Sequence, residues 1–91
     1  MNIDINSKDF QEIVNDFKNN HLDIALNKLK KLSINYPDEY LVIKLFASIY
    51  FKKLDWKNAI KSYKKLILFE KEKFKTHNDI GVAYFKLGKI N

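Results

Sequence analysis

The sequence predicts an all-α fold, and three observations support this prediction. The chain of 91 residues contains only two glycines and one proline, too few for the many tight turns of an all-β domain. Hydrophobic residues make up 46% of the chain and recur every three or four residues, which is helical spacing. The third observation is an internal repeat with a period of about 34 residues, which is typical of a helix–turn–helix unit.

Shifting the chain by one such period reveals this repeat. The identical positions include Phe17, Phe51 and Phe85; Lys18, Lys52 and Lys86; Ala25 and Ala59; and Tyr50 and Tyr84. A Phe-Lys pair that recurs at two equal steps is a strong sign of an ordered repeat. We therefore expect a single module with one helix pair over about 6–37, a second over about 38–71, and the first helix of a third unit over about 72–88, after which the repeat is truncated.

The first pair of helices follows from apolar spacing. Residues at i, i+3, i+4 and i+7 predict one helix over 10–17 and a second over 22–32, with the polar run 19–21 as the turn between them. Pro37 closes this pair, because the residue before a proline avoids helical geometry.

Three further helices are predicted. The segment 38–53 is apolar on nearly every side, so we expect neighbours to cover it on several sides. Asp55 is an expected N-cap for the fourth helix, whose inner face begins at Trp56. The fifth helix is predicted over 74–87, and Gly88 suits its C-terminus because glycine readily adopts left-handed backbone geometry.

The pattern resembles the tetratricopeptide repeat (TPR) family, which stacks helix pairs of this repeat length. The resemblance covers about residues 8–91 and rests mainly on Ala47, Tyr50, Leu54, Asp55, Trp56, Ala59, Tyr63 and Leu66, and on Ile80, Gly81, Tyr84, Phe85, Leu87 and Gly88. The first unit departs from the family at Ile13, where a small residue is usual. The resemblance implies a right-handed α-solenoid of antiparallel helix pairs, with the first helix of each pair lining a concave groove.

The resemblance also implies a non-catalytic protein–protein interaction module that binds a partner peptide or helix in this groove. The implied groove residues are Phe10, Val14, Phe17 and Lys18; Leu41, Lys44, Ser48, Phe51 and Lys52; and Lys75, Asn78, Val82, Phe85 and Lys86. They form a row of phenylalanines edged by lysines, so we expect a partner with apolar anchors and acidic flanks. The same phenylalanines could instead pack between neighbouring helices.

The charge distribution leaves two alternatives. The net charge is +6, and residues 28–91 hold fifteen lysines against six carboxylates, a charge of +9. The outer face of the fourth helix, with Lys57, Lys61, Lys64 and Lys65, could contact nucleic acid or an anionic membrane. The absence of arginine argues against nucleic acid. The other alternative is a self-association or scaffold module of a larger protein, forming a homo-oligomer through its uncapped last helix.

Catalysis finds no support in the sequence. Cysteine is absent, which excludes disulfides and thiolate chemistry. His21 and His77 are isolated from each other, and the His-x-x-x-His spacing of a helical zinc site is absent. No glycine-rich loop is present to bind phosphate. We expect no enzyme activity, metal or cofactor. The sequence has neither a transmembrane segment nor a signal peptide, so we expect a cytoplasmic location.

Overall fold

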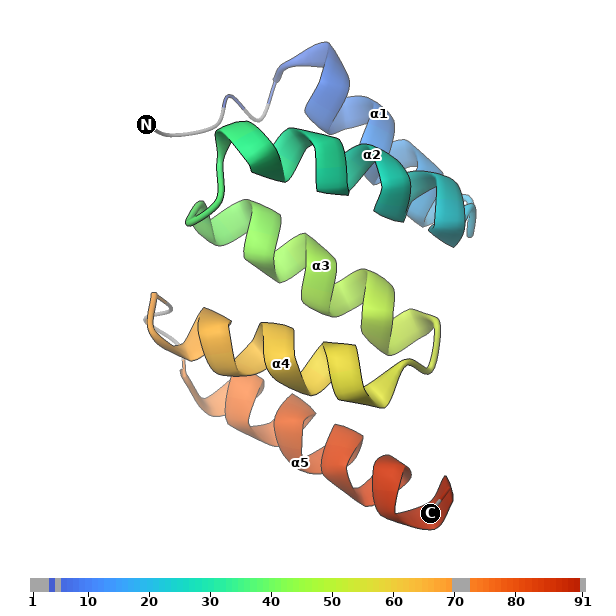
Figure 1. Cartoon of the computed structure of the whole chain (residues 1–91), viewed down its shortest axis with the longest axis vertical. Helices are drawn as coiled ribbons and strands as arrows, with labels where there is room; N and C mark the ends of the chain where they lie inside the picture. The colour runs from blue at the N-terminus through green and yellow to red at the C-terminus, as the bar shows by residue number, and fades with distance from the viewer. Residues whose placement is uncertain (1–3, 5, 70–72, 91) are drawn as a thin grey trace.

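The computed structural model is a stack of α-helices that follow one another along the long axis of the molecule (Figure 1). It describes residues 4, 6–69 and 73–90 and, in the last helix, the side chains of 78–88. These residues form α1 (Lys8–Lys18), α2 (Leu22–Asn35), α3 (Tyr40–Lys52), α4 (Trp56–Ile67) and α5 (Lys73–Ile90), and they contain no strand. The molecule measures 38 × 28 × 19 Å. The all-α prediction is confirmed.

Two helices begin at side-chain caps. The Oγ of Ser7 accepts a hydrogen bond from the backbone N–H of Phe10 at 3.3 Å, which satisfies a free donor in the first turn of α1. The carboxylate of Asp55 accepts from the backbone N–H of Asn58 at 3.4 Å, so the expected cap of α4 is confirmed. Pro37 lies in the connection between α2 and α3, as predicted.

The end of the fifth helix was predicted wrongly. We expected Gly88 to end it in a left-handed conformation, but α5 continues to Ile90 and neither glycine of the chain has a positive φ. Glycine accepts the right-handed helical geometry as well as the left-handed one. The backbone after Gly88 continues α5 to Ile90.

The repeat of the sequence is also a repeat of the backbone. The turns between α1 and α2 and between α3 and α4 each contain one left-handed residue, Asn20 with φ 65° and Leu54 with φ 62°, and these two lie one repeat period apart. Their hydrogen bonds match at the same interval. The matching donor–acceptor pairs are Asn19–Asn15 and Lys53–Ile49, Asn20–Phe17 and Leu54–Phe51, and His21–Asp16 and Asp55–Tyr50. The two turns therefore have the same structure.

The substitution Leu54→Gly is expected to stabilise the protein by about 1 kcal/mol, because a left-handed leucine clashes with its own backbone. Leu54 is 65% exposed, so little buried area is lost. Asn20→Gly is the matched control and should change the free energy of unfolding by only a few tenths of a kcal/mol, since asparagine tolerates this conformation. Urea unfolding measures both changes. A loss of stability on Leu54→Gly would show that the leucine side chain contributes more than its conformation costs.

The core also follows the repeat. One cluster joins α1, α2 and the near side of α3, and includes Leu26 and Ile49. Another joins the far side of α3 to α4, where Ala47 and Ala59 are fully buried. A third joins α4 to α5 and includes Ile60 and Ala83, the equivalents of Leu26 and Ile49 in the next unit. The packing of α3 on α2 thus recurs in the packing of α5 on α4. Helix α3 is covered on two sides, in agreement with the prediction that neighbours cover it.

Candidate partner-binding hollow

An open hollow of about 490 Å³ lies where side chains from α1, α3, α4 and α5 meet. We call it the hollow; its lining consists of Phe17, Ser48, Phe51, Lys52, Leu54, Tyr63 and Asp79. Its volume is within the range of about 300–1,000 Å³ that is typical of ligand sites. The structure therefore brings together four residues of α1 and α3 that the sequence predicts for one groove, namely Phe17, Ser48, Phe51 and Lys52.

Aromatic packing fixes the shape of the hollow. The ring of Phe51 meets the ring of Trp56 edge-on, with centroids 5.1 Å apart, and the ring of Tyr63 edge-on at 6.2 Å. Such pairs hold rings in a defined orientation. Phe51 therefore does two things at once. It packs against the core of α4, and it forms part of the wall of the hollow.

Two opposite charges border the hollow. The Nζ of Lys52 lies over the ring of Phe17, 5.0 Å from its centroid, in a cation–π contact. The carboxylate of Asp79 enters the lining from α5. The arrangement offers an apolar surface with one cation and one anion at its edges. A ligand that fits it would bury an apolar group and place its charges at defined points.

Tyr63 supplies a hydroxyl group that stays protonated. Burial, and to a lesser extent the carboxylate of Asp79, raises the pKa of the Tyr63 phenol to about 12. Both causes disfavour the negatively charged phenolate. The phenol therefore keeps its proton to a higher pH than an ordinary tyrosine, which titrates near about 10.

The remaining predicted groove residues do not line the hollow. Phe10 is the clear correction, because its side chain is buried in the core between α1 and α2 and is not available to a partner. Val14 and Leu41 are partly buried against the same core. Val82 is half-buried and the following are exposed: Lys18, Lys44, Asn78, Phe85 and Lys86. The side chain of Lys75 lies outside the described residues.

Three lining residues were absent from the predicted groove. Leu54 lies in the left-handed turn after α3, and Tyr63 belongs both to the core cluster between α3 and α4 and to the lining of the hollow. Asp79 could have been found from spacing. It lies three residues before Val82 and seven before Lys86, so it shares their helix face.

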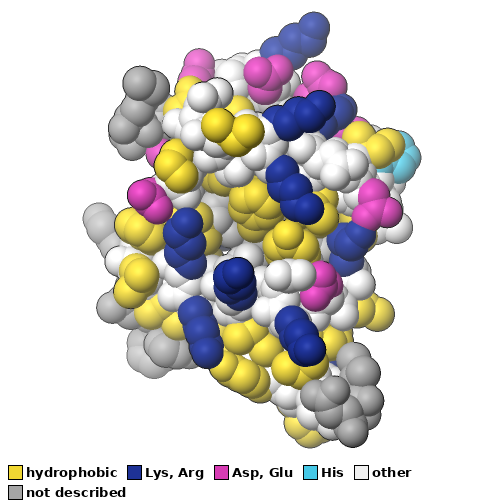
Figure 2. All heavy atoms as spheres, in the orientation of Figure 1, with side chains coloured by type: hydrophobic (Ala, Val, Ile, Leu, Met, Phe, Trp, Pro, Cys, Tyr) yellow, Lys and Arg dark blue, Asp and Glu magenta, His cyan; other side chains and the backbone are white. Residues whose placement is uncertain are grey.

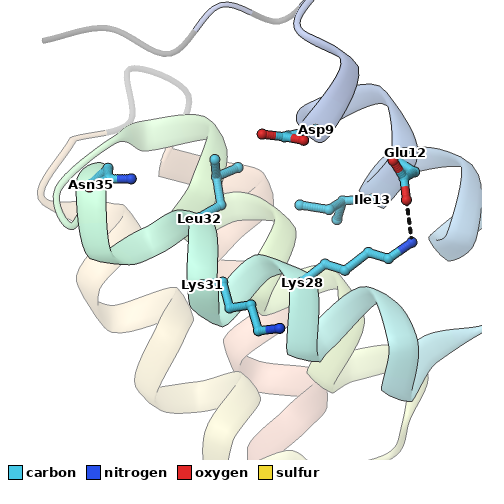
Figure 3. A pocket seen from close by; sticks show the side chains of 7 residues that line it. All are labelled: Asp9, Glu12, Ile13, Lys28, Lys31, Leu32 and Asn35. Atoms are coloured by element: carbon cyan, nitrogen blue, oxygen red, sulfur yellow. Dashed lines mark hydrogen bonds and ion pairs between the residues drawn. The ribbon is translucent and has the colours of Figure 1, made fainter.

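A second cavity, of about 350 Å³, opens between α1 and α2 (Figure 3). Lys28 extends from α2 across its edge and donates hydrogen bonds to Glu12 at 2.7 Å and Asp16 at 2.8 Å. The bonds to Asp16 and then Glu12 raise the pKa of Lys28. Ile13 lines this cavity at the repeat position that α3 fills with Ala47. A larger side chain there holds α1 away from α2, so we attribute the opening to packing.

Lysine side chains are spread over the face of the molecule shown in Figure 2, with apolar side chains between them. The four lysines of the fourth helix are all exposed. Of these, Lys65 donates to the carbonyl of Pro37 at 3.1 Å and lies 3.6 Å from the carboxylate of Asp38, and Lys64 lies over the ring of Tyr84 at 5.5 Å. Part of this positive surface is thus engaged in contacts within the protein.

In the described part of the chain, no helix is long and apolar enough to cross a membrane. No three histidine or carboxylate side chains gather closely enough among those residues to hold a metal ion. Comparison of the chain with models of known protein families, with curated proteins and with solved structures found no match. The resemblance to the TPR family therefore rests on the sequence pattern of this chain alone.

Proposed function

We propose that this protein is a TPR-like interaction module that binds a peptide or helix of a partner protein in the hollow. One observation carries the proposal. Phe17 and Phe51 occupy the same position in successive repeats, and Lys52 follows Phe51 in the repeated Phe-Lys pair. All three residues line the one hollow. Exposed apolar clusters bordered by charge mark interaction sites.

The chemistry of the hollow defines the partner. A large apolar side chain would fill the space between the rings of Phe17 and Phe51 and exclude water from both. A neighbouring carboxylate of the partner would approach the Nζ of Lys52. The excess of lysines over carboxylates in residues 28–91 favours an acidic partner, because complementary charge speeds encounter.

Ser48→Trp tests the proposal, because it fills the hollow from α3 without removing a core residue. Peptides selected from a random display library on the immobilised protein should combine a large apolar residue with nearby Asp or Glu. Their affinity, measured by isothermal titration calorimetry, should fall at least tenfold on Ser48→Trp. The control Asn27→Trp places the same side chain on an exposed site of α2 and should bind as the wild type does.

A second variant tests the charge of the partner. Lys52→Glu should remove the preference of the hollow for acidic peptides.

Selected peptides that bind Ser48→Trp and the wild type equally well would place the binding site elsewhere. A selection that enriches no peptide would contradict the proposed function itself.

A further inference from the structure

The two charges of the hollow come from different helices. Lys52 belongs to α3, and its Nζ is directed toward α1, where it lies over the ring of Phe17. Asp79 belongs to α5 and lines the hollow together with Tyr63 of α4. Helices α1 and α5 lie at opposite ends of the stack (Figure 1). The cation is therefore on the α1 side of the hollow, and the anion is on the α5 side.

Asp79 is the charge that the proposed function leaves unused. Its side chain is partly buried, and no hydrogen bond or ion pair joins its carboxylate to another of the described residues. The lining of the hollow contains one cation, Lys52, and this side chain contacts Phe17 instead. The carboxylate of Asp79 thus borders an apolar space without a positive partner in the described part of the chain.

Binding changes the surroundings of both charges. A partner residue that fills the apolar space of the hollow removes water from Lys52 and from Asp79. A charge that loses its water is stabilised again by an opposite charge or by hydrogen bonds. A partner carboxylate that approaches Lys52 on the α1 side supplies nothing to Asp79 on the α5 side. Asp79 therefore requires a cation of its own from the partner.

We propose that Asp79 determines specificity, by selecting a partner segment with a lysine or arginine on the α5 side of its apolar anchor, opposite the acidic residue that approaches Lys52. This inference rests on the proposed function, because it concerns the same hollow. It adds one basic residue at a fixed place to the acidic partner inferred above. The hollow then recognises three side chains in order along the stack: acidic, apolar and basic.

A double-mutant cycle tests the pair that Asp79 forms with the partner. The probes are peptides that are selected on the wild-type protein and lose affinity on Ser48→Trp. In the peptide, glutamine replaces the basic residue; in the protein, Asp79→Asn removes the charge at nearly constant shape. Isothermal titration calorimetry should show a loss of about fivefold or more for either change alone, and no further loss when both are made. Asp79→Asn should keep the helix content by circular dichroism, because this side chain belongs to none of the core clusters.

Asp9→Asn is the matched control. It removes the same charge from an exposed site of α1, outside the lining of the hollow, and should leave the affinities within about twofold of wild type.

Exchanging the two charges gives a second test at a constant net charge. The double variant with Lys52→Glu and Asp79→Lys keeps the net charge of +6, so the long-range attraction of a partner is unchanged. It should bind a peptide whose acidic and basic residues are exchanged about fivefold or more tightly than the selected peptide.

Three outcomes would overturn this inference alone. In the first, the selected peptides require the hollow but carry no basic residue opposite the acidic one. In the second, replacing the basic residue costs the same affinity on wild type and on Asp79→Asn. In the third, the double variant keeps the preference of the wild type. Peptides that bind Ser48→Trp as well as wild type, or a selection that enriches none, would contradict the proposed function, and this inference would fall with it.

Discussion

Ala47→Leu is expected to lower the free energy of unfolding by about 1–3 kcal/mol, because it adds three carbon atoms where none fits. Ala47 and Ala59 are both fully buried in the cluster between α3 and α4. A leucine would force these helices apart. Neither helix can move freely, since α3 also packs on α1 and α2, and α4 also packs on α5. Urea unfolding followed by circular dichroism measures the loss.

The matched control is the same residue at the equivalent position of α5. Gly81→Leu should not destabilise the protein, and should raise its stability by up to about 1 kcal/mol through helix propensity, because among the described residues no atom lies within 4 Å of an added Cβ. The two substitutions therefore have opposite expected signs at one repeat position. Equal losses at both positions would show that the repeat position itself excludes leucine, independently of a covering helix.

The first unit shows how a large residue at this position is accommodated. Ile13 occupies the position of Ala47 and is 1% exposed. Helix α1 lies at one end of the stack, so it can shift outward, and the cavity beside Ile13 lies at this junction. Lys28 then connects the two helices by its bonds to Glu12 and Asp16. The central helix α3 has no such freedom.

The sequence was most informative where one feature decides the structure. The apolar spacing placed all five helices to within a few residues. The apolar residues on nearly every side of 38–53 predicted that neighbours cover this helix, and α3 is covered on two sides. The burial of Ala47 against α4 follows from the same logic, since only small residues allow two backbones to approach closely. These properties depend on periodicity along the chain, which a sequence displays directly.

The lining of the hollow was harder to predict from the sequence, because it depends on how each helix is rotated about its own axis. Phe10 was assigned to the groove by its place in the repeat, but α1 turns that side chain into the core. Tyr63 enters the hollow from α4, the second helix of its pair, and no spacing within one helix reveals such a meeting. Gly88 suited a left-handed turn, but glycine does not require one.

Alkaline pH is expected to destabilise the protein through Tyr63. The pKa of this tyrosine rises to about 12 on folding, while an unfolded tyrosine titrates near about 10. Between these values the unfolded state loses the proton and the folded state keeps it. The free energy of unfolding should therefore fall as pH rises from about 10 to 12, by about 2 kcal/mol from this residue. The stabilising contribution is fully present below about pH 10.

Tyr63→Phe should make this fall distinctly smaller, because phenylalanine has no proton to lose. It should not abolish the fall, since the pKa of Tyr50 is raised by burial and then by Asp55, and the pKa of Lys28 is raised by its carboxylate partners. The protonated forms of Tyr50 and Lys28 also stabilise the folded state, and this stabilisation is lost as the pH rises. Urea midpoints between about pH 9 and 11.5 measure the slope. Tyr84→Phe, at an exposed ring, should leave the contribution of Tyr63 in place, and parallel pH profiles for Tyr63→Phe and wild type would contradict the assignment.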